Sequence, residues 1–227
     1  ISPALADVAP GMMNYYYSQA TDKECFVSGP SGMGYTMPMN TFGKNKGNQF
    51  RNDNNFTAFV EMTDDYLQRA GLRVVTIWDN LSKSQRNIYT SSAPYLYGLT
   101  VHHFTDSSLK KKFTGVVNDT LIMQMTPAYL AQNAEGNLPL TAIENDINDA
   151  VKYLKYNGNA PVFVATQVSV WAFHNINDVV YLEDHLSDYY EGIYGRDVVE
   201  FVRADHFYNL YYEANNLPRD LKLRSEL

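Results

Sequence analysis

The chain has 227 residues, 45% of them hydrophobic, which is enough for one continuous core, and we expect a single α/β domain over residues 1–227. Its net charge is −7 and its densest positive run, Lys110 to Lys112, is short, so the sequence argues against a nucleic-acid partner. No apolar stretch approaches the roughly 20 residues that cross a bilayer, and the single cysteine, Cys25, excludes an internal disulfide framework.

Helix-like and strand-like segments alternate along the chain. Ser2 and Pro3 have the character of an N-cap and a first helical residue, and Gly71 that of a C-cap. Thr141, with Glu144 three positions later, has the capping-box pattern. With the apolar periodicity, these signals predict helices at 4–20, 56–70, 82–90, 107–113, 141–156, 177–194 and 207–214. Apolar and β-rich runs predict strands at 25–28, 72–78, 97–101, 120–125, 161–169 and 198–202.

This alternation predicts an α/β fold in which parallel strands form a sheet with helices packed against it. A TIM-barrel-like domain, incomplete because strands upstream of Ile1 are missing, is one arrangement, and a doubly wound open sheet is the alternative. The start at Ile1 without a signal peptide indicates a mature product or an excised part of a longer protein. In both arrangements the functional residues are expected at the carboxyl ends of the strands.

A loop rich in glycine and proline follows the first predicted strand, within the run ECFVSGPSGMGYTMPMN at 24–40. Its glycines and prolines exclude both a sheet ladder and a helix. Gly32 and Gly34 flank Met33 and permit a positive φ or the close approach of a ligand, which leaves Tyr35 as the large side chain on display. We interpret the segment as a site loop, with a surface turn around an aromatic plug as the alternative. The third glycine of a dinucleotide fingerprint is missing, so we do not expect phosphate capture here.

The run Gly32-Met33-Gly34-Tyr35-Thr36-Met37-Pro38 resembles the signature for which the GxGYxYP putative glycoside hydrolase family is named, with Met37 in place of the second tyrosine. Ser2-Pro3-Ala4-Leu5 and Asp205-His206-Phe207 are similar to other parts of that family's carboxy-terminal domain. The resemblance covers most of the chain. It implies a barrel-like α/β domain from a longer, secreted or periplasmic bacterial protein that processes carbohydrate, with no cofactor.

Polar and aromatic side chains follow the predicted strands. Because the carboxyl ends of parallel strands share one rim, we expect these side chains to lie near one another. They are Ser28 with the glycine loop, Asp79, His102 and His103, Gln124, Gln167 and Trp171, and Asp205 with His206.

Asp79 and Asp205 are the best-placed carboxylates for glycoside hydrolysis, which needs one carboxyl to protonate the leaving oxygen and a second to act as nucleophile or to activate water. Arg203, Asp205 and His206 place three ionisable groups around one predicted strand end, where electrostatics can tune a pKa. The structural alternatives are a helix cap near Phe207 for Asp205 and a turn or cap for Asp79.

His102 and His103 suggest a metal site only superficially. Adjacent side chains of an extended strand point to opposite faces, so both cannot be ligands of one ion without a turn. A site of two histidines and one carboxylate with Asp205 and His206 is the metal alternative, but the spacing is not that of a ligand set, and we expect no metal.

Aromatic residues are abundant, with 18 tyrosines and two tryptophans, which suits stacking on sugar rings as well as core packing. Trp171 is the better candidate for a sugar subsite, whereas we expect Trp78 to be buried within its strand.

The sequence thus predicts a glycoside hydrolase domain that acts on oligo- or polysaccharides, with Asp205 and Asp79 as the catalytic pair. The predicted substrate-binding residues are Gly32, Gly34, Tyr35, His103, Gln167, Trp171 and His206. The alternatives are a carbohydrate-binding module without catalysis and a metal-assisted hydrolase such as a deacetylase.

Overall fold

The computed structural model describes residues 1–43, 50–78, 80–102, 114–128, 148, 152, 161–168, 176–196 and 198–217. The chain forms two compact units, which are described separately below. The first unit is Ile1–Asp106, Lys112–Gln124 and Arg203–Leu227, and the second is Ser107–Lys111 and Met125–Val202.

The first unit is built on a sheet in which β1 (Val74–Trp78) pairs with β2 (Gly98–His102) and β2 pairs with β4 (Thr120–Ala128), both in parallel. Ser28 forms a parallel bridge with Val75 of β1, so neighbouring strands follow the order of the chain. The predicted strand 25–28 is therefore reduced to one bridging residue, and Cys25 is half-buried.

A short hairpin completes this sheet. β3 (Gly115–Val117) runs antiparallel to β4. The two turn residues, Asn118 and Asp119, have φ values of 45° and 60°, and a two-residue hairpin whose turn matches the strand twist requires positive φ at both positions.

The second unit holds the end of β4, where Met125–Ala128 pairs in parallel with β5 (Ala165–Val168), and α7 (Ile176–Tyr194). The described strands thus form a mainly parallel sheet with one antiparallel strand, and this sheet is not closed. The fold is α/β, and it is compatible both with an incomplete barrel and with a doubly wound open sheet. The predicted strand at 198–202 is wrong, since these residues have no regular structure. The predicted helix at 107–113 lies outside the described residues, as does nearly all of that at 141–156.

Local signals explain the two long helices of the first unit. α4 (Asp53–Ala70) starts where the Asn52 side chain accepts a hydrogen bond from the Asn55 N–H at 2.6 Å, and it ends at Gly71, whose φ of 67° confirms the predicted C-cap. α5 (Lys83–Ser92) starts with a capping box between Ser82 and Gln85.

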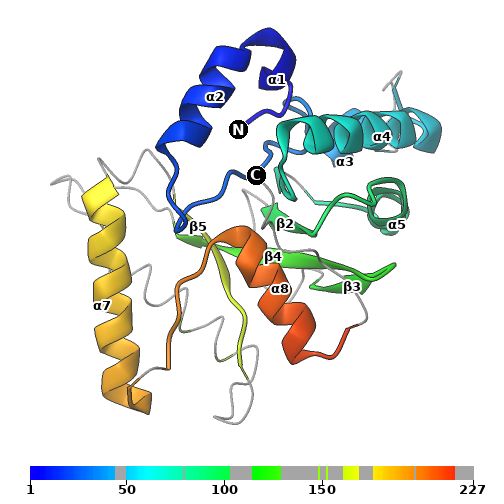
Figure 1. The fold of residues 1–227 in the computed structure, drawn as a ribbon. Helices are drawn as coiled ribbons and strands as arrows, with labels where there is room; N and C mark the ends of the chain where they lie inside the picture. The colour runs from blue at the N-terminus through cyan, green and yellow to red at the C-terminus, as the bar shows by residue number, and fades with distance from the viewer. Residues whose placement is uncertain are drawn as a thin grey trace, which may run out of the picture. The chain divides into compact units, whose positions relative to one another are not determined.

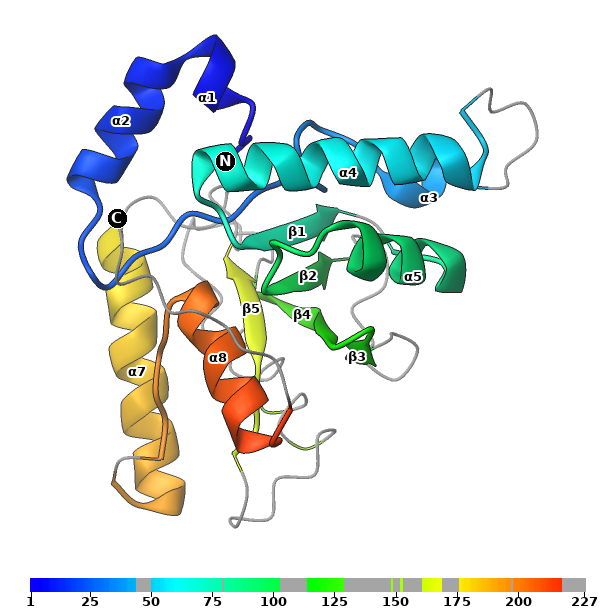
Figure 2. The same cartoon turned by 45° about the vertical axis from the view of Figure 1, so that its right-hand side comes forward.

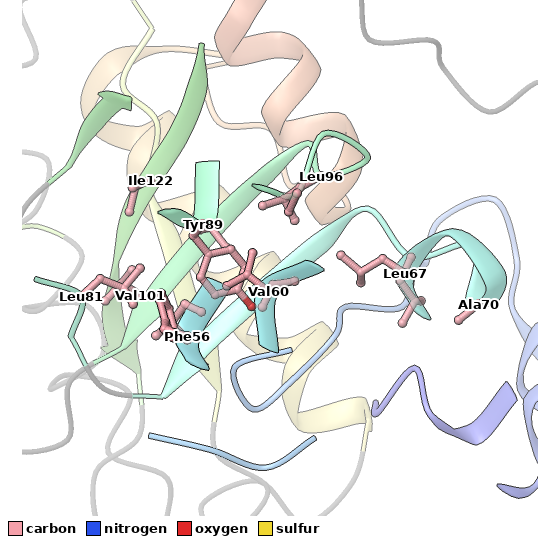
Figure 3. Packing of buried hydrophobic residues seen from close by; sticks show 14 of the residues in the cluster. Phe56, Val60, Leu67, Ala70, Leu81, Tyr89, Leu96, Val101 and Ile122 are labelled. Carbon is pink, nitrogen blue, oxygen red and sulfur yellow. The ribbon is translucent and has the colours of Figure 1, made fainter. Parts of the chain in front are cut away.

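α4 and α5 lie side by side in Figures 1 and 2 and cover one face of the sheet, here called the α4 face. Figure 3 shows Phe56 and Val60 of α4 and Tyr89 of α5 packed near Val101 of β2. The buried cluster also takes Val75 and Ile77 of β1, Leu99 of β2 and Ile122 of β4. These strand residues alternate along the chain, so the side chains between them point to the opposite face.

That opposite face, here called the α8 face, packs against α8 (Ala204–Ala214) at the amino ends of the strands. A Cβ on Gly98, the first residue of β2, would lie 1.9 Å from the ring of Tyr208, so only glycine admits this buried tyrosine. The Tyr212 hydroxyl donates to the Tyr97 carbonyl at 2.7 Å and accepts from the Leu121 N–H at 2.6 Å. The last helix is thereby fixed across the start of two neighbouring strands.

The amino-terminal segment forms two helices where the sequence predicts one. α1 (Leu5–Val8) and α2 (Pro10–Gln19) are separated at Ala9, which has φ −152°. Pro10 explains the break, because it has no N–H and disfavours a helical residue before it. α3 (Pro38–Thr41) is a single turn after the glycine loop. In the part of the chain that the structure describes, no helix is long and apolar enough to span a bilayer.

Candidate active-site edge

The loop of residues 28–38, here called the motif loop, is fixed to the carboxyl end of β1 through Ser31, which has no exposed surface. The Ser31 N–H donates to the Thr76 carbonyl at 2.7 Å, and the Ser31 Oγ accepts from the Trp78 N–H at 2.9 Å. The Ser31 carbonyl accepts from the Tyr89 hydroxyl at 2.9 Å. All three contacts are internal to the first unit and leave the loop little freedom at its base.

The loop turns through two residues with positive φ, Ser31 at 71° and Gly32 at 129°. A Cβ on Gly32 would approach the Thr63 Oγ1 to 2.6 Å and the Tyr89 hydroxyl to 2.9 Å, so this position requires glycine on both counts. Ser31 adopts a conformation that costs a non-glycine residue of order 1 kcal/mol or more, and such strained residues concentrate at functional sites.

Beyond this turn the loop presents Tyr35, whose side chain is 68% exposed. Its ring meets the half-buried Trp78 edge-on, with ring centroids 5.8 Å apart and an interplanar angle of 75°. Trp78 is in register with His102 of β2 and points to the same face, the α8 face. His102 itself is buried, with 1% of its surface exposed.

One row nearer the amino ends, the Thr76 and Thr100 hydroxyls form a hydrogen bond of 2.8 Å on the same face. The carboxyl end of this sheet therefore combines the exposed ring of Tyr35 and the half-buried ring of Trp78 with two hydroxyls and a buried histidine beneath them. Such a mixture of aromatic and polar groups is typical of sites for polar organic ligands.

Asp205 lies elsewhere, in the first turn of α8, and the prediction that it follows a strand is wrong. Arg203 binds its carboxylate with two hydrogen bonds, Nε to Oδ1 at 2.8 Å and Nη2 to Oδ2 at 3.1 Å. The His206 N–H also donates to Asp205 Oδ1, at 2.9 Å, and Arg203 Nη1 donates to the Asp22 carbonyl at 2.8 Å. The carboxylate is thus held in an ion pair at the start of α8. It does not cap the helix, since the N-cap residue is Arg203.

This ion pair is at the amino end of the sheet. Burial raises the pKa of the neighbouring Cys25 thiol, and the Asp205 backbone beside it opposes this shift. Cys25 precedes Ser28 by three residues, and Ser28 is level with Val75, three residues before Trp78. Asp205 and the Tyr35–Trp78 pair therefore lie toward opposite ends of β1.

The structure therefore unites Gly32, Gly34 and Tyr35 on one loop and separates them from Asp205 and His206. His206 is exposed on α8. Asp79, His103 and Trp171 lie outside the described residues, as does the side chain of Gln167, whose backbone is part of β5. The roles predicted for all of these residues remain predictions.

Two contributors were not predicted from the sequence as part of the site. Trp78, expected to be buried, is the partner of Tyr35, and Ser31 connects the loop to β1. The position of Trp78 as the last residue of its strand was the available signal. Within the described ranges, no three His, Cys, Asp or Glu side chains are grouped closely enough to hold a metal ion.

Comparison with known proteins gives two matches. The family model described as "GxGYxYP putative glycoside hydrolase C-terminal domain" matches residues 1–212. The fold is similar to the crystal structure of a putative hydrolase from Bacteroides thetaiotaomicron VPI-5482, with a TM-score of 0.64 and 18% sequence identity. The match covers 94% of this chain and 38% of that one, so the chain spans well under half the length of its structural relative. No curated protein matches the sequence.

Proposed function

The chain belongs to the GxGYxYP putative glycoside hydrolase family as its C-terminal domain, and we propose that it is the part of a carbohydrate-processing protein that holds a glycan against Tyr35. The placement of an exposed aromatic ring on a rigid loop at the carboxyl end of β1 is the observation that carries this proposal. Strand carboxyl ends are where α/β folds bind their ligands.

The Tyr35–Trp78 pair suits a sugar ring for physical reasons. A pyranose has an apolar face of C–H groups that covers an aromatic ring, and a rim of hydroxyls that needs hydrogen-bonding partners. Trp78 supports the Tyr35 ring edge-on and limits its rotation, and the hydrogen bonds at Ser31 fix the loop that carries it. A surface that is ordered before binding loses less conformational entropy when the ligand arrives.

Hydrolysis needs two carboxyl groups about 5 to 9.5 Å apart at the scissile bond. Asp205 lies toward the other end of the sheet and forms an ion pair with Arg203, so its contacts favour a structural role. Asp79 directly follows Trp78 in the sequence, and we propose it as the carboxylate of this domain to test first for catalysis.

A panel of oligosaccharides tests the binding proposal with the wild-type chain, Tyr35→Ala and Tyr15→Ala. Tyr15, on α2, is a matched control because it is 62% exposed and also meets a second aromatic ring, that of Tyr16, at 6.2 Å. We expect Tyr35→Ala to weaken glycan binding by about tenfold or more, as truncation of a central aromatic contact does, and Tyr15→Ala to bind as wild type. Equal binding by all three proteins would refute the assignment of Tyr35.

Release of reducing sugar from any glycan that binds tests catalysis separately. If the domain contributes its acid through Asp79, Asp79→Asn abolishes release while binding persists, and Asp205→Asn affects release only through stability. Release by the Asp79→Asn variant at the wild-type rate would remove Asp79 from the mechanism.

A further inference from the structure

Gly32 and Gly34, two of the three glycines of the motif loop, differ in the reason for which glycine is present. Gly32 is required by its positive φ and by the contacts that a Cβ would make. At Gly34 a Cβ would meet nothing within 4 Å among the described residues, and its φ is outside the left-handed region. The fold therefore does not require a residue without a side chain at Gly34. A ligand that approaches the main chain closely would require one.

The main chain beside Gly34 is open for hydrogen bonding. Within the described residues, no hydrogen bond involves the N–H or C=O groups of Gly34, Tyr35 or Thr36, although those on either side are engaged. The Met33 N–H donates to Thr63 Oγ1 at 3.2 Å, and the Met37 carbonyl accepts from the Asn40 N–H at 3.0 Å. Three consecutive residues thus present donors and acceptors next to the exposed ring of Tyr35.

The motif loop carries no charged side chain, and neither do the described residues that hydrogen-bond to it. The sequence has no Asp, Glu, Lys, Arg or His between Glu24 and Lys44. Among the described residues outside the loop, the side chains that bind it by hydrogen bonds are also uncharged: Ser2, Asn40, Thr41, Thr63, Gln85 and Tyr89. Recognition of a carboxylate or sulfate on a sugar normally employs an arginine or lysine, and a chain of net charge −7 repels such anions.

From these three observations we infer that the strip Gly34–Thr36 recognises a neutral glycan through its main chain, with Gly34 kept bare so that the sugar can approach the backbone. This inference rests on the proposed function and adds to it the class of ligand and the groups that bind its hydroxyls. Tyr35 supplies the apolar contact, and the amides on either side supply the polar ones.

Binding of neutral and acidic probes to the full chain tests this inference. The neutral probes are cello-, xylo-, manno- and malto-oligosaccharides, and the acidic probes are oligosaccharides of polygalacturonate and hyaluronan. We expect binding among the neutral probes only, and a loss of about tenfold or more in Gly34→Ala, since one added methyl group at a close contact has an effect of this size. Gly11→Ala is the matched control, because Gly11 of α2 also has nothing within 4 Å of its Cβ position.

The thermal midpoint of Gly34→Ala should equal that of the wild type, which separates a binding defect from a folding defect. Amide hydrogen exchange provides a second measurement on the unaltered protein. The amides of Gly34, Tyr35 and Thr36 should exchange more slowly when a saturating neutral probe is bound. Unchanged exchange at all three would overturn the inference even if Gly34→Ala were unstable.

The remaining outcomes separate the inference from the proposed function. If Tyr35→Ala loses binding and Gly34→Ala does not, the main-chain inference is wrong and the glycan site stands. If acidic probes bind and depend on Tyr35, the neutral class is wrong and the site again stands. If the wild type binds none of the probes, both proposals fall.

Discussion

The two ends of the sheet in the first unit are stabilised by different means. At the amino end, α8 is fixed by an ion pair between Arg203 and Asp205 and by the buried hydroxyl of Tyr212. At the carboxyl end, the motif loop is fixed by Ser31 through neutral hydrogen bonds, and Tyr35 is left exposed. In this chain, therefore, a cluster of ionisable groups fixes a helix to the sheet, whereas the candidate site is an uncharged loop held by neutral hydrogen bonds.

The largest effect on stability is expected from Gly32→Ala at the carboxyl end. The new methyl group would overlap Thr63 Oγ1 and the Tyr89 hydroxyl, and alanine would have to adopt φ near 129°. We expect a loss of about 3 kcal/mol or more in the free energy of unfolding, measured by urea denaturation. Gly34→Ala is the control, with an expected change within about 0.5 kcal/mol. Similar effects of the two substitutions would contradict the different roles assigned to the two glycines.

At the amino end, Asp205→Asn should destabilise the protein without affecting glycan binding. It removes one charge of a half-buried ion pair and leaves Arg203 unpaired, at a cost of about 1 to 2 kcal/mol. Urea denaturation measures the stability, and the same oligosaccharide panel measures binding. A variant with wild-type stability that no longer releases sugar would instead support the role of Asp205 as a catalytic acid, which the sequence predicts.

Tyr89→Phe tests how far the rigidity of the motif loop depends on α5. The substitution keeps the buried ring and removes the donor to the Ser31 carbonyl, which should cost about 1 kcal/mol. Because the loop is then less firmly held, we expect weaker glycan binding as well. Titration of the best neutral oligosaccharide measures this effect. Thr90→Val is the control for binding. Thr90 is on the same helix, but its hydroxyl forms hydrogen bonds only within α5 and with Asn118, not with the motif loop.

The smallest effect is expected from Asp64 of α4, a buried carboxylate that accepts hydrogen bonds from the Tyr95 N–H at 2.9 Å and from Gln68 Nε2 at 2.8 Å. Burial raises its pKa above the ordinary value, so the folded state binds a proton more tightly than the unfolded state. Its contribution to stability is therefore fully present below the unfolded pKa of about 4 and is lost as the pH rises through the folded pKa.

Asp64→Asn removes this titration. Relative to the wild type, the variant should gain stability as the pH increases from about 3.5 to 6, as followed by thermal midpoints across that range. A constant difference between the two proteins at every pH would show that Asp64 titrates normally.

The sequence predicted elements well where local signals and apolar periodicity agree. α4 and α5 have both caps or capping boxes and amphipathic spacing, and β1 and β2 are apolar runs buried on both faces. The segment 198–202 has a similar apolar composition but finds no ladder partner among the described strands, and pairing is a tertiary property that composition does not reveal.

The error about Asp205 follows from that same segment. Once 198–202 was taken as a strand, Asp205 and His206 were placed at a carboxyl end, whereas they begin a helix at the opposite end of the sheet. The motif loop was recognisable from its glycines, and the exposure of Tyr35 was expected. The positive φ of Ser31 and the contact of Tyr35 with Trp78 could not be predicted, because both depend on segments far apart in the sequence.

The discontinuous make-up of the first unit has a consequence for its biogenesis. Tyr212 is 115 residues from the carbonyl it binds at Tyr97 and 91 residues from the amide of Leu121. During translation, β1, β2 and β4 emerge from the ribosome long before α8, so the ring that covers Gly98 arrives last. Until α8 has been synthesised, the part of the sheet that it covers lacks this packing partner. Exposed apolar surface of this kind is what chaperones commonly bind.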